Sequence, residues 1–200
     1  MVEVRLASKE DAAEILEIYA PYILNTTVSF ETQLPSIEQF QQRIENCLKT
    51  YPWIVAVLNG RVAGYAYASK HREREAYQWT CECSVYMHND FRGKAIAKLL
   101  YELLFQILKQ QQFRNVYAGI TMPNDASIRF HEKCGFEKFA YYENIGFKFS
   151  SWHSVGWWKL QINDYDQQLP PPLKLSQLKP EFFAHLFKQT SLKIQEILGF

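Results

Sequence analysis

An α/β fold, with helices packed on a mixed sheet, is predicted by three observations. Two apolar runs, 53–58 and 61–68, flank Asn59-Gly60, which is a strong signal for a two-residue β-hairpin turn. Leucine and isoleucine side chains between Ile96 and Leu108 recur at helical spacing and form one continuous apolar face. The 200 residues are 48% hydrophobic and 22% charged, which is typical of a globular chain and excludes a disordered one.

The first half of the chain is expected to form one strand, two helices and a three-stranded meander. Ser8 with Asp11, and Ser36 with Gln39, have the spacing of capping boxes, which mark helix starts. Pro21 is expected to end or bend the first helix. The expected elements are a strand at 2–6, a helix ending near 24, a helix opening at 36 with its apolar stripe running to 48, and strands at 53–58, 61–68 and 78–87.

The second half is expected to alternate helices and strands and then to add a helical extension. Gly135 has the position of a glycine that ends a helix. The triplet Pro170-Pro171-Pro172 marks a boundary, so we divide the chain into a domain at 1–169 and an extension at 170–200. The expected elements are helices at 96–108, 124–133 and 180–198 and strands at 116–120, 136–142 and 155–162. The last helix is apolar enough to need a partner surface, which could be this domain, a second subunit or a substrate groove.

Charge and patterning argue against several function classes. Lys plus Arg is 22 and Asp plus Glu is 21, so the chain lacks the basic excess of a general nucleic-acid binder. We expect no membrane association, because no apolar run is long enough to span a bilayer and the N-terminus has no signal-peptide pattern. The four cysteines have no zinc-site spacing, so we expect no metal and a cytoplasmic protein with reduced thiols. The 31 aromatic residues are expected to fill the core, and to line a pocket or a dimer interface as well.

The segment 82–100 carries the clearest chemical signal. A strand ends near Met87, and a short basic loop then leads into the long helix. Backbone N–H groups at a helix start are unpaired and carry partial positive charge, to which Arg92, Lys94 and Lys98 add full charges. The segment is therefore interpreted as a phosphate or pyrophosphate cradle, with a solvated basic turn as the alternative.

The stretch Arg92-Gly93-Lys94-Ala95-Ile96-Ala97 resembles the R/Q-x-x-G-x-G/A acetyl-CoA loop of the GCN5-related N-acetyltransferases (GNAT). Longer stretches resemble the phosphinothricin acetyltransferase branch of that family and together span about residues 2 to 165 in the same order; they lie at 18–31, 61–86, 122–136 and 146–158. The resemblance implies a mostly antiparallel sheet that splays into a V between its fourth and fifth strands. Residues 170–200 are not covered by it, so their helix would be an addition to the GNAT fold.

The resemblance also implies an acetyl-CoA site. The pantetheine would enter the V, and the N–H of Val85 would polarise the thioester carbonyl as an oxyanion-hole donor does. The implied ligands are Val85, Met87, Arg92, Gly93, Lys94, Ala95, Ile96, Ala97, Lys98, Asn124 and Ser127. Ala95 departs from the family pattern, which has glycine there; the cradle is expected to survive if the φ angle of Ala95 is negative.

Two catalytic residues are implied. Glu82 matches the glutamate that is the usual general base, and an aromatic wall facing it would raise its pKa; the alternative is an exposed glutamate paired with a lysine. His131 is the candidate acid for the departing thiolate, or a helix-end histidine with no chemical duty. Cys81 and Cys83 share the opposite strand face, where an acyl-cysteine step is weighed against an ordinary role as small core residues.

The branch acetylates the α-amine of small amino acids of the phosphinothricin, methionine sulfoximine and methionine sulfone type. Arg72 and Arg74 match its basic pair, which suits carboxylate recognition, with a charged hairpin tip as the alternative. Further implied substrate contacts are Phe30, Glu31, Tyr77, Lys148 and Trp152, several of which are expected to face a neighbouring subunit. The branch is generally dimeric, so we expect a homodimer. The branch often has an aspartate where this chain has Ser154, so the precise acceptor stays open. The alternatives are an acetyltransferase for a peptide or protein N-terminus or an antibiotic amine, and a non-catalytic CoA-binding or interaction module, with Ala95 as a sign of decay and the 170–200 helix as the working surface.

Overall fold

The computed structural model describes residues 1–165 and 170–199. Their helices and strands are β1 (Val2–Leu6), α1 (Ala12–Leu24), α2 (Ile37–Leu48), β2 (Trp53–Leu58), β3 (Arg61–Lys70), β4 (Thr80–Met87), α3 (Ile96–Gln110), β5 (Asn115–Thr121), α4 (Asp125–Lys133), β6 (Glu137–Lys148), β7 (Ser151–Gln161) and α5 (Pro180–Leu198). The strands form one seven-stranded sheet in the order β1-β2-β3-β4-β5-β7-β6. Every neighbouring pair is antiparallel except β4 and β5, so the predicted mixed sheet is confirmed.

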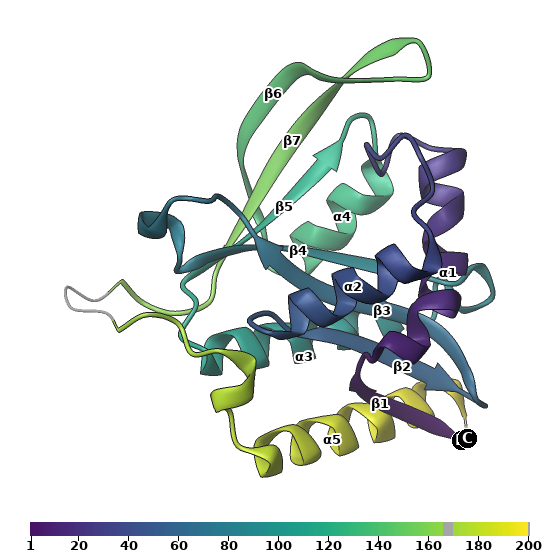
Figure 1. The fold of residues 1–200 in the computed structure, drawn as a ribbon, viewed down its shortest axis with the longest axis vertical. Helices are drawn as coiled ribbons and strands as arrows, with labels where there is room; N and C mark the ends of the chain where they lie inside the picture. Colours follow the sequence, from purple (N-terminus) through teal and green to yellow (C-terminus); the bar gives the residue numbers. More distant parts are fainter. Residues whose placement is uncertain (166–169, 200) are drawn as a thin grey trace.

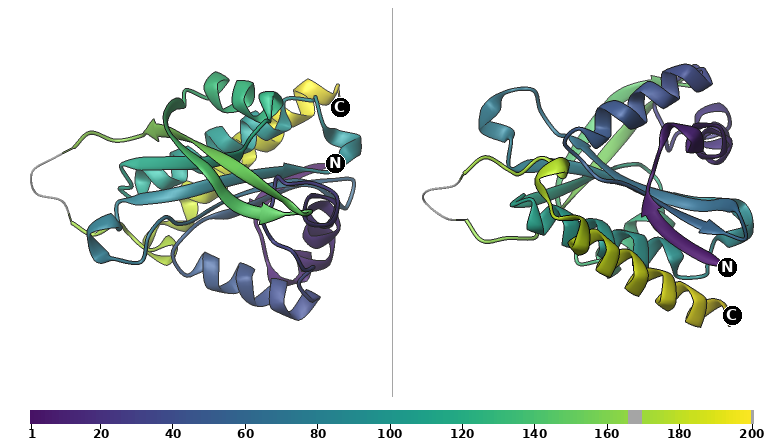
Figure 2. Two further views of the ribbon diagram at one scale, coloured as in Figure 1. Left: turned by 90° about the horizontal axis from the view of Figure 1, so that it is seen from above. Right: turned by 60° about the horizontal axis from the view of Figure 1, so that its bottom comes forward.

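Helices cover both faces of the sheet. The helices α1 and α2 lie on one face and α3, α4 and α5 on the other, as the two turned views show (Figure 2). Each face has its own core. Ile15, Phe40 and Trp53 are buried in the α1–α2 layer, and Leu104 and Trp158 are buried in the α3 layer.

Local signals predict most of the boundaries correctly. The Ser36 side chain accepts a hydrogen bond from the N–H of Gln39, and the Gln39 side chain accepts one from the N–H of Ser36, which completes the capping box. Asn59 and Gly60 both have positive φ angles, as the two-residue hairpin turn requires. Pro21 does not end α1, which continues to Leu24.

The hairpin formed by β6 and β7 is longer than the sequence predicts. Pairing continues to Lys148 and Ser151, whereas the expected strands cover 136–142 and 155–162 only. The hairpin extends away from the body of the molecule (Figure 1). Its outer part carries exposed aromatic residues and a register shift between Tyr142 and Gly146, so the alternation of buried and exposed residues that identifies a strand is lost there.

The extension packs onto the domain itself, which answers the question of its partner. Leu186 and Ile194 of α5 are buried in the same core as α3, and α5 lies along the outer strand β1 (Figure 1). The N–H of Val4 on β1 donates to Ser191 Oγ at 2.9 Å. Within the described residues, no helix has the length and apolar character needed to cross a membrane.

Candidate active site

The strands β4 and β5 separate at the centre of the sheet. They pair only from Thr80 to Glu82, although β4 continues to Met87 and β5 to Thr121 (Figure 1). The N–H of His88 donates to Ala63 O on the β3 side. Because consecutive residues of a strand point their N–H groups to opposite sides, Val85 and Met87 direct theirs toward the gap beside β5. This gap therefore offers a row of backbone groups to an extended ligand.

The loop before α3 forms a second set of free backbone donors. Gly93 and Ala95 have φ angles of 74° and 59°, and α3 begins directly after them. Within the described part of the chain, the N–H groups of residues 93–95 have no hydrogen-bond partner. Successive free N–H groups at a helix N-terminus form an anion-binding concavity, so the loop can hold a phosphate or pyrophosphate.

Ala95 corrects one expectation. The phosphate cradle is expected to keep its shape if the φ angle of Ala95 is negative. In the structure Ala95 is left-handed, with φ 59° and ψ 0°. A left-handed alanine costs about 1–2 kcal/mol because its Cβ crowds the carbonyl oxygen. The chain therefore keeps the backbone shape that a glycine would adopt at this position, and it does so under strain.

Two of the basic residues in this segment are held by aromatic rings. The Arg92 guanidinium lies 5.2 Å from the ring centroid of Tyr22 and donates to its hydroxyl at 2.6 Å. The Lys94 ammonium lies 5.3 Å from the ring of Phe91. Lys98 lies on the first turn of α3, where it pairs with Glu102 at 3.7 Å. The loop therefore has three positive charges close to its free N–H groups.

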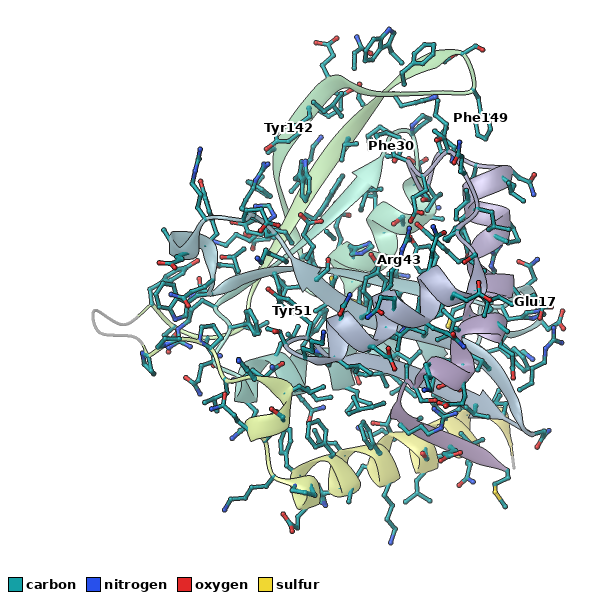
Figure 3. The ribbon with its side chains drawn as sticks, viewed as in Figure 1. Glu17, Phe30, Arg43, Tyr51, Tyr142 and Phe149 are labelled. Carbon is teal, nitrogen blue, oxygen red and sulfur yellow. The ribbon has the colours of Figure 1, made fainter. Side chains whose placement is uncertain are left out.

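Glu82 lies in an apolar cavity of about 310 Å³ next to the gap between β4 and β5. The cavity is lined by Phe30, Arg72, Glu82, Tyr142, Ile145, Val155 and Trp157. Tyr142 lies on β6, and Phe30 lies at the same end of the sheet, near the β6–β7 hairpin (Figure 3). Burial raises the pKa of Glu82, while a hydrogen bond from His71 and the charge of Arg72 oppose that rise. A raised pKa brings a carboxyl group closer to the range that suits general-base catalysis.

The two cysteines beside Glu82 point into the opposite face of the sheet. Cys81 and Cys83 are both buried in the α3 core. Burial raises the pKa of Cys83 to about 12 and that of Cys81 well above its ordinary value. A thiol that stays protonated is a poor nucleophile, so the environment of both residues favours the core role over an acyl-cysteine step.

His131 is enclosed rather than open to a substrate. Its Nδ1 lies 2.8 Å from Ser127 O, and its Nε2 lies 3.1 Å from the hydroxyl of Tyr101. The residue is 7% exposed, and burial lowers its pKa, so the ring is neutral at neutral pH. Asn124 caps α4 by accepting from the N–H of Ser127. These contacts favour the structural alternative for His131 over direct proton donation.

Only part of the expected acceptor site comes together. Phe30, Arg72 and Glu82 line one cavity. Arg74 and Tyr77 line a neighbouring cleft with Arg72. Glu31 does not line the Glu82 cavity. Arg43 donates to both carboxylate oxygens of Glu31, at 2.8 and 3.0 Å. The Glu31 side chain instead lines a separate aromatic cavity under α2.

Lys148 and Trp152 do not line the Glu82 cavity within one chain. The Lys148 ammonium donates to the carbonyl oxygens of Ile23, Thr26 and Ser29 at 2.6–2.9 Å, so all three of its hydrogens are used inside the protein. It ties the hairpin to the end of α1. Trp152 is 62% exposed near the hairpin tip, where its ring contacts that of Phe147.

Sequence reasoning misses two residues of the site. His71 falls in the segment interpreted as a charged hairpin tip, but its ring contacts the carboxyl group of Glu82. Trp157 lines the cavity and meets the His71 ring at 5.7 Å. The β3–β4 register, in which Ser69 lies opposite Glu82, would have indicated that a residue shortly after Ser69 can reach Glu82. Among the described residues, no cluster of three or more potential metal ligands is found.

Comparison with known proteins agrees with this geometry. A family model described as an acetyltransferase (GNAT) domain matches residues 4–157. Phosphinothricin N-acetyltransferase of Streptomyces viridochromogenes is 35% identical over 85% of this chain and 91% of its own length. L-methionine sulfoximine/L-methionine sulfone acetyltransferase of Salmonella typhimurium is 32% identical over 81% of this chain and 95% of its own length.

A solved structure supports the same assignment. The phosphinothricin acetyltransferase of Sinorhizobium meliloti, in complex with acetyl-CoA, superposes with a TM-score of 0.79 at 30% identity, covering 91% of this chain and 97% of that one. The family match spans β1 to β7, and it includes the separated strands, the loop before α3 and Glu82. The chain therefore belongs to the GNAT family of acetyltransferases.

Proposed function

We propose that this enzyme transfers the acetyl group of acetyl-CoA to the α-amine of a small amino acid or amino-acid analogue. The observation that carries the proposal is the position of Glu82. Its carboxyl group lies in an apolar cavity beside the gap between β4 and β5, so a base and a row of thioester-binding backbone groups adjoin each other. The relatives named for phosphinothricin and for methionine sulfoximine and sulfone indicate the acceptor class.

The residues present fit the acetyl donor. The free N–H groups of residues 93–95 and the charges of Arg92, Lys94 and Lys98 suit its pyrophosphate. A Cβ added at Gly93 would meet no atom beyond the neighbouring residues within 4 Å, so the loop is open to a ligand. Acetyl-CoA supplies an activated thioester when bound. The backbone of Val85 and Met87 would hold its pantetheine arm, with Asn124 and Ser127 at the start of α4 on the other side of the gap.

The chain's own groups supply the remaining steps. Arg72 would bind the acceptor carboxylate and direct its amine toward Glu82. Glu82 would take a proton from the ammonium group, which frees the nitrogen lone pair for attack on the thioester carbonyl. The N–H of Val85 would stabilise the negative charge that develops on the carbonyl oxygen. Because both nitrogens of His131 already have partners, a proton for the thiolate is more readily supplied by solvent.

The cavity walls narrow the acceptor class. Apart from Arg72 and Glu82, its lining is apolar or aromatic. One arginine can satisfy one carboxylate, and a second anionic group on the acceptor side chain would lie against Phe30, Ile145 or Val155 at a desolvation cost. The cavity thus favours uncharged side chains such as that of methionine sulfone over phosphinothricin.

A homodimer formed through the β6–β7 hairpin is part of the proposal. The hairpin exposes a group of large apolar side chains, and such patches mark interaction surfaces. Its exposed members are Phe139, Tyr141, Tyr142, Ile145, Phe147, Phe149 and Trp152. A second copy would cover them and close the Glu82 cavity, since Tyr142 and Ile145 belong to both surfaces.

The test is thiol release from acetyl-CoA with a panel of free amines. Methionine sulfone, methionine sulfoximine, phosphinothricin, glutamate and short peptides would each be assayed with the wild type and Glu82→Gln. We expect turnover of the sulfone-type amino acids and a loss of at least about a hundredfold in the variant, within the usual range of general-base catalysis. Turnover of peptides alone, or full activity of Glu82→Gln, would contradict the proposal.

A further inference from the structure

We propose that His71 is the positioning residue of the catalytic base: its Nδ1–H holds one oxygen of Glu82 and leaves the other oxygen to receive the proton of the acceptor. The inference rests on the proposed function of Glu82 and adds a residue to it. It concerns a contact between the end of β3 and the middle of β4, which lie side by side in the sheet.

His71 and Glu82 are in direct contact. His71 Nδ1 lies 2.9 Å from Glu82 Oε1, the distance of a charge-assisted hydrogen bond. Within the described part of the chain, Oε2 of Glu82 accepts no hydrogen bond, and Nε2 of His71 has no partner. A carboxylate with one oxygen fixed and one free has a single direction from which a proton can arrive. That direction opens into the apolar cavity, since Glu82 is part of its lining.

The imidazole is fixed by rings on three sides. It stacks on Tyr117 of β5 with ring centroids 4.8 Å apart and an interplanar angle of 26°. Trp157 of β7 and Tyr77 meet it edge-on, at 5.7 and 6.3 Å. The His71 side chain is 13% exposed. A ring held in this way already orients its N–H toward Glu82, so little further side-chain entropy is lost when the hydrogen bond forms.

The electrostatic role follows from the surroundings of the pair. The ionisable groups that face it are Arg72 beside it, Tyr77 on the following turn, Tyr117 on β5 and Tyr142 on β6. Burial makes ionised Glu82 unfavourable, and the contact with His71 is the largest effect that opposes burial. Without the N–H donor, less of Glu82 would be ionised at neutral pH, and the remaining carboxylate could rotate toward Arg72.

The experiment compares His71→Phe with His71→Asn. Phenylalanine keeps a ring to stack on Tyr117 but has no donor, whereas the asparagine amide can present N–H near the position of Nδ1. In His71→Phe we expect the acidic limb of the pH profile of kcat/KM to move upward by about one unit, with about a tenfold loss below the limb. His71→Asn should return the limb toward that of the wild type. His185→Asn, on the exposed side of α5, serves as the matched control.

Two measurements separate positioning from packing. The affinity for acetyl-CoA, measured by calorimetry, should be unchanged in His71→Phe. The carboxyl group of Glu82 should titrate at higher pH in His71→Phe by ¹³C NMR, with its signal assigned by its absence in Glu82→Gln. An unchanged limb and titration in His71→Phe, or an equal defect in His71→Asn, would overturn the inference. Full activity of Glu82→Gln would instead overturn the proposed function, and the NMR titration would still decide whether His71 controls Glu82.

Discussion

The N–H of Val4 donates to the hydroxyl of Ser191 at 2.9 Å, so the first strand and the last helix are joined across 187 residues. The strand β1 is at the edge of the sheet, and the unpaired N–H groups of an edge strand can form hydrogen bonds with a strand of another chain. Ser191 satisfies one of these groups, and α5 covers the apolar surface of α3 beside it. The extension thus protects an edge and completes a core.

Removal of residues 170–200 should therefore produce an insoluble or molten chain. The deletion exposes the apolar surface of the domain that Leu175, Leu178, Leu186 and Ile194 now cover. The protein also loses the free energy gained by burying these four side chains, about 1.5–3 kcal/mol for each. That loss is comparable with the stability of a typical domain. Near-UV circular dichroism and solubility would report it, and Ser191→Ala, which removes one hydrogen bond, should cost only about 1 kcal/mol. A truncated chain with native Tm and altered kinetics would indicate regulation instead.

Ala95→Gly should stabilise the protein. Glycine relieves the left-handed strain of Ala95, which adds about 1–2 kcal/mol to the free energy of unfolding. Glycine also gives the unfolded chain more conformational freedom, which lowers the free energy of unfolding by about 0.4–1 kcal/mol. Denaturant unfolding should therefore show a gain of about 0.5–1 kcal/mol. Ala97→Gly, at a position inside α3 without positive φ, should destabilise and provides the control. A loss of stability in Ala95→Gly would mean that the left-handed conformation is not the one adopted in solution.

Lys148→Met should destabilise the protein by about 3–5 kcal/mol, because three carbonyl oxygens, those of Ile23 and Ser29 in buried contacts and that of Thr26 in a part-buried one, lose a charged donor. Burial lowers the pKa of Lys148, and the negative charge of Glu31 opposes that shift. Thermal unfolding would measure the effect. Lys188→Met, on the exposed face of α5, should change stability by less than about 0.5 kcal/mol. Equal Tm values for the two variants would contradict the bracing role.

Glu82→Gln should raise stability at neutral pH even though it removes the proposed base. The pKa of Glu82 is higher in the folded chain than in the unfolded one, since burial disfavours its charge. As pH rises between these two pKa values the unfolded state loses its proton first, so stability falls, and the penalty is complete above the folded pKa. Glutamine carries no charge and has no such penalty. The difference in Tm between wild type and variant should therefore be small at about pH 4, near the ordinary pKa of a glutamate, and grow toward neutral pH; a constant difference would show that the pKa is not raised.

Charged residues on the hairpin should break the proposed dimer. Trp152→Asp and Phe147→Asp place a carboxylate in the exposed aromatic patch, where burial by a second copy would be costly. Light scattering after size-exclusion chromatography should give twice the 23.6 kDa chain mass for the wild type and a single chain mass for the variants. Leu192→Asp, at an exposed apolar position on α5, is the control and should leave the mass unchanged. A wild type that elutes as a monomer would contradict the dimer.

Much of the fold is predictable because its signals are local. The capping residues Ser36 and Gln39 lie within one helical turn, and the turn at Asn59-Gly60 needs only two residues with positive φ. The apolar face that begins at Ile96 repeats over consecutive turns of one helix. Each signal involves residues close in sequence, and the structure confirms all three.

The contents of the site depend on contacts that no local pattern contains. The resemblance to a known family predicts roles for Glu82 and the loop at 92–97, but the contact between His71 and Glu82 depends on the register of β3 and β4 and on rings supplied by β5 and β7. The three carbonyl partners of Lys148 lie more than a hundred residues before it.

The sequence by itself determined the helices, the hairpin of β2 and β3, the order of the elements and the family. Only the tertiary structure decided that Ala95 is left-handed, that the Lys148 ammonium joins the hairpin to the end of α1, and that α5 covers β1 and α3. The physical reason is the sequence distance over which each effect acts: propensity, capping and periodicity depend on residues within a few positions of one another. Burial, charge pairing and sheet register, by contrast, depend on which distant segments meet when the core closes.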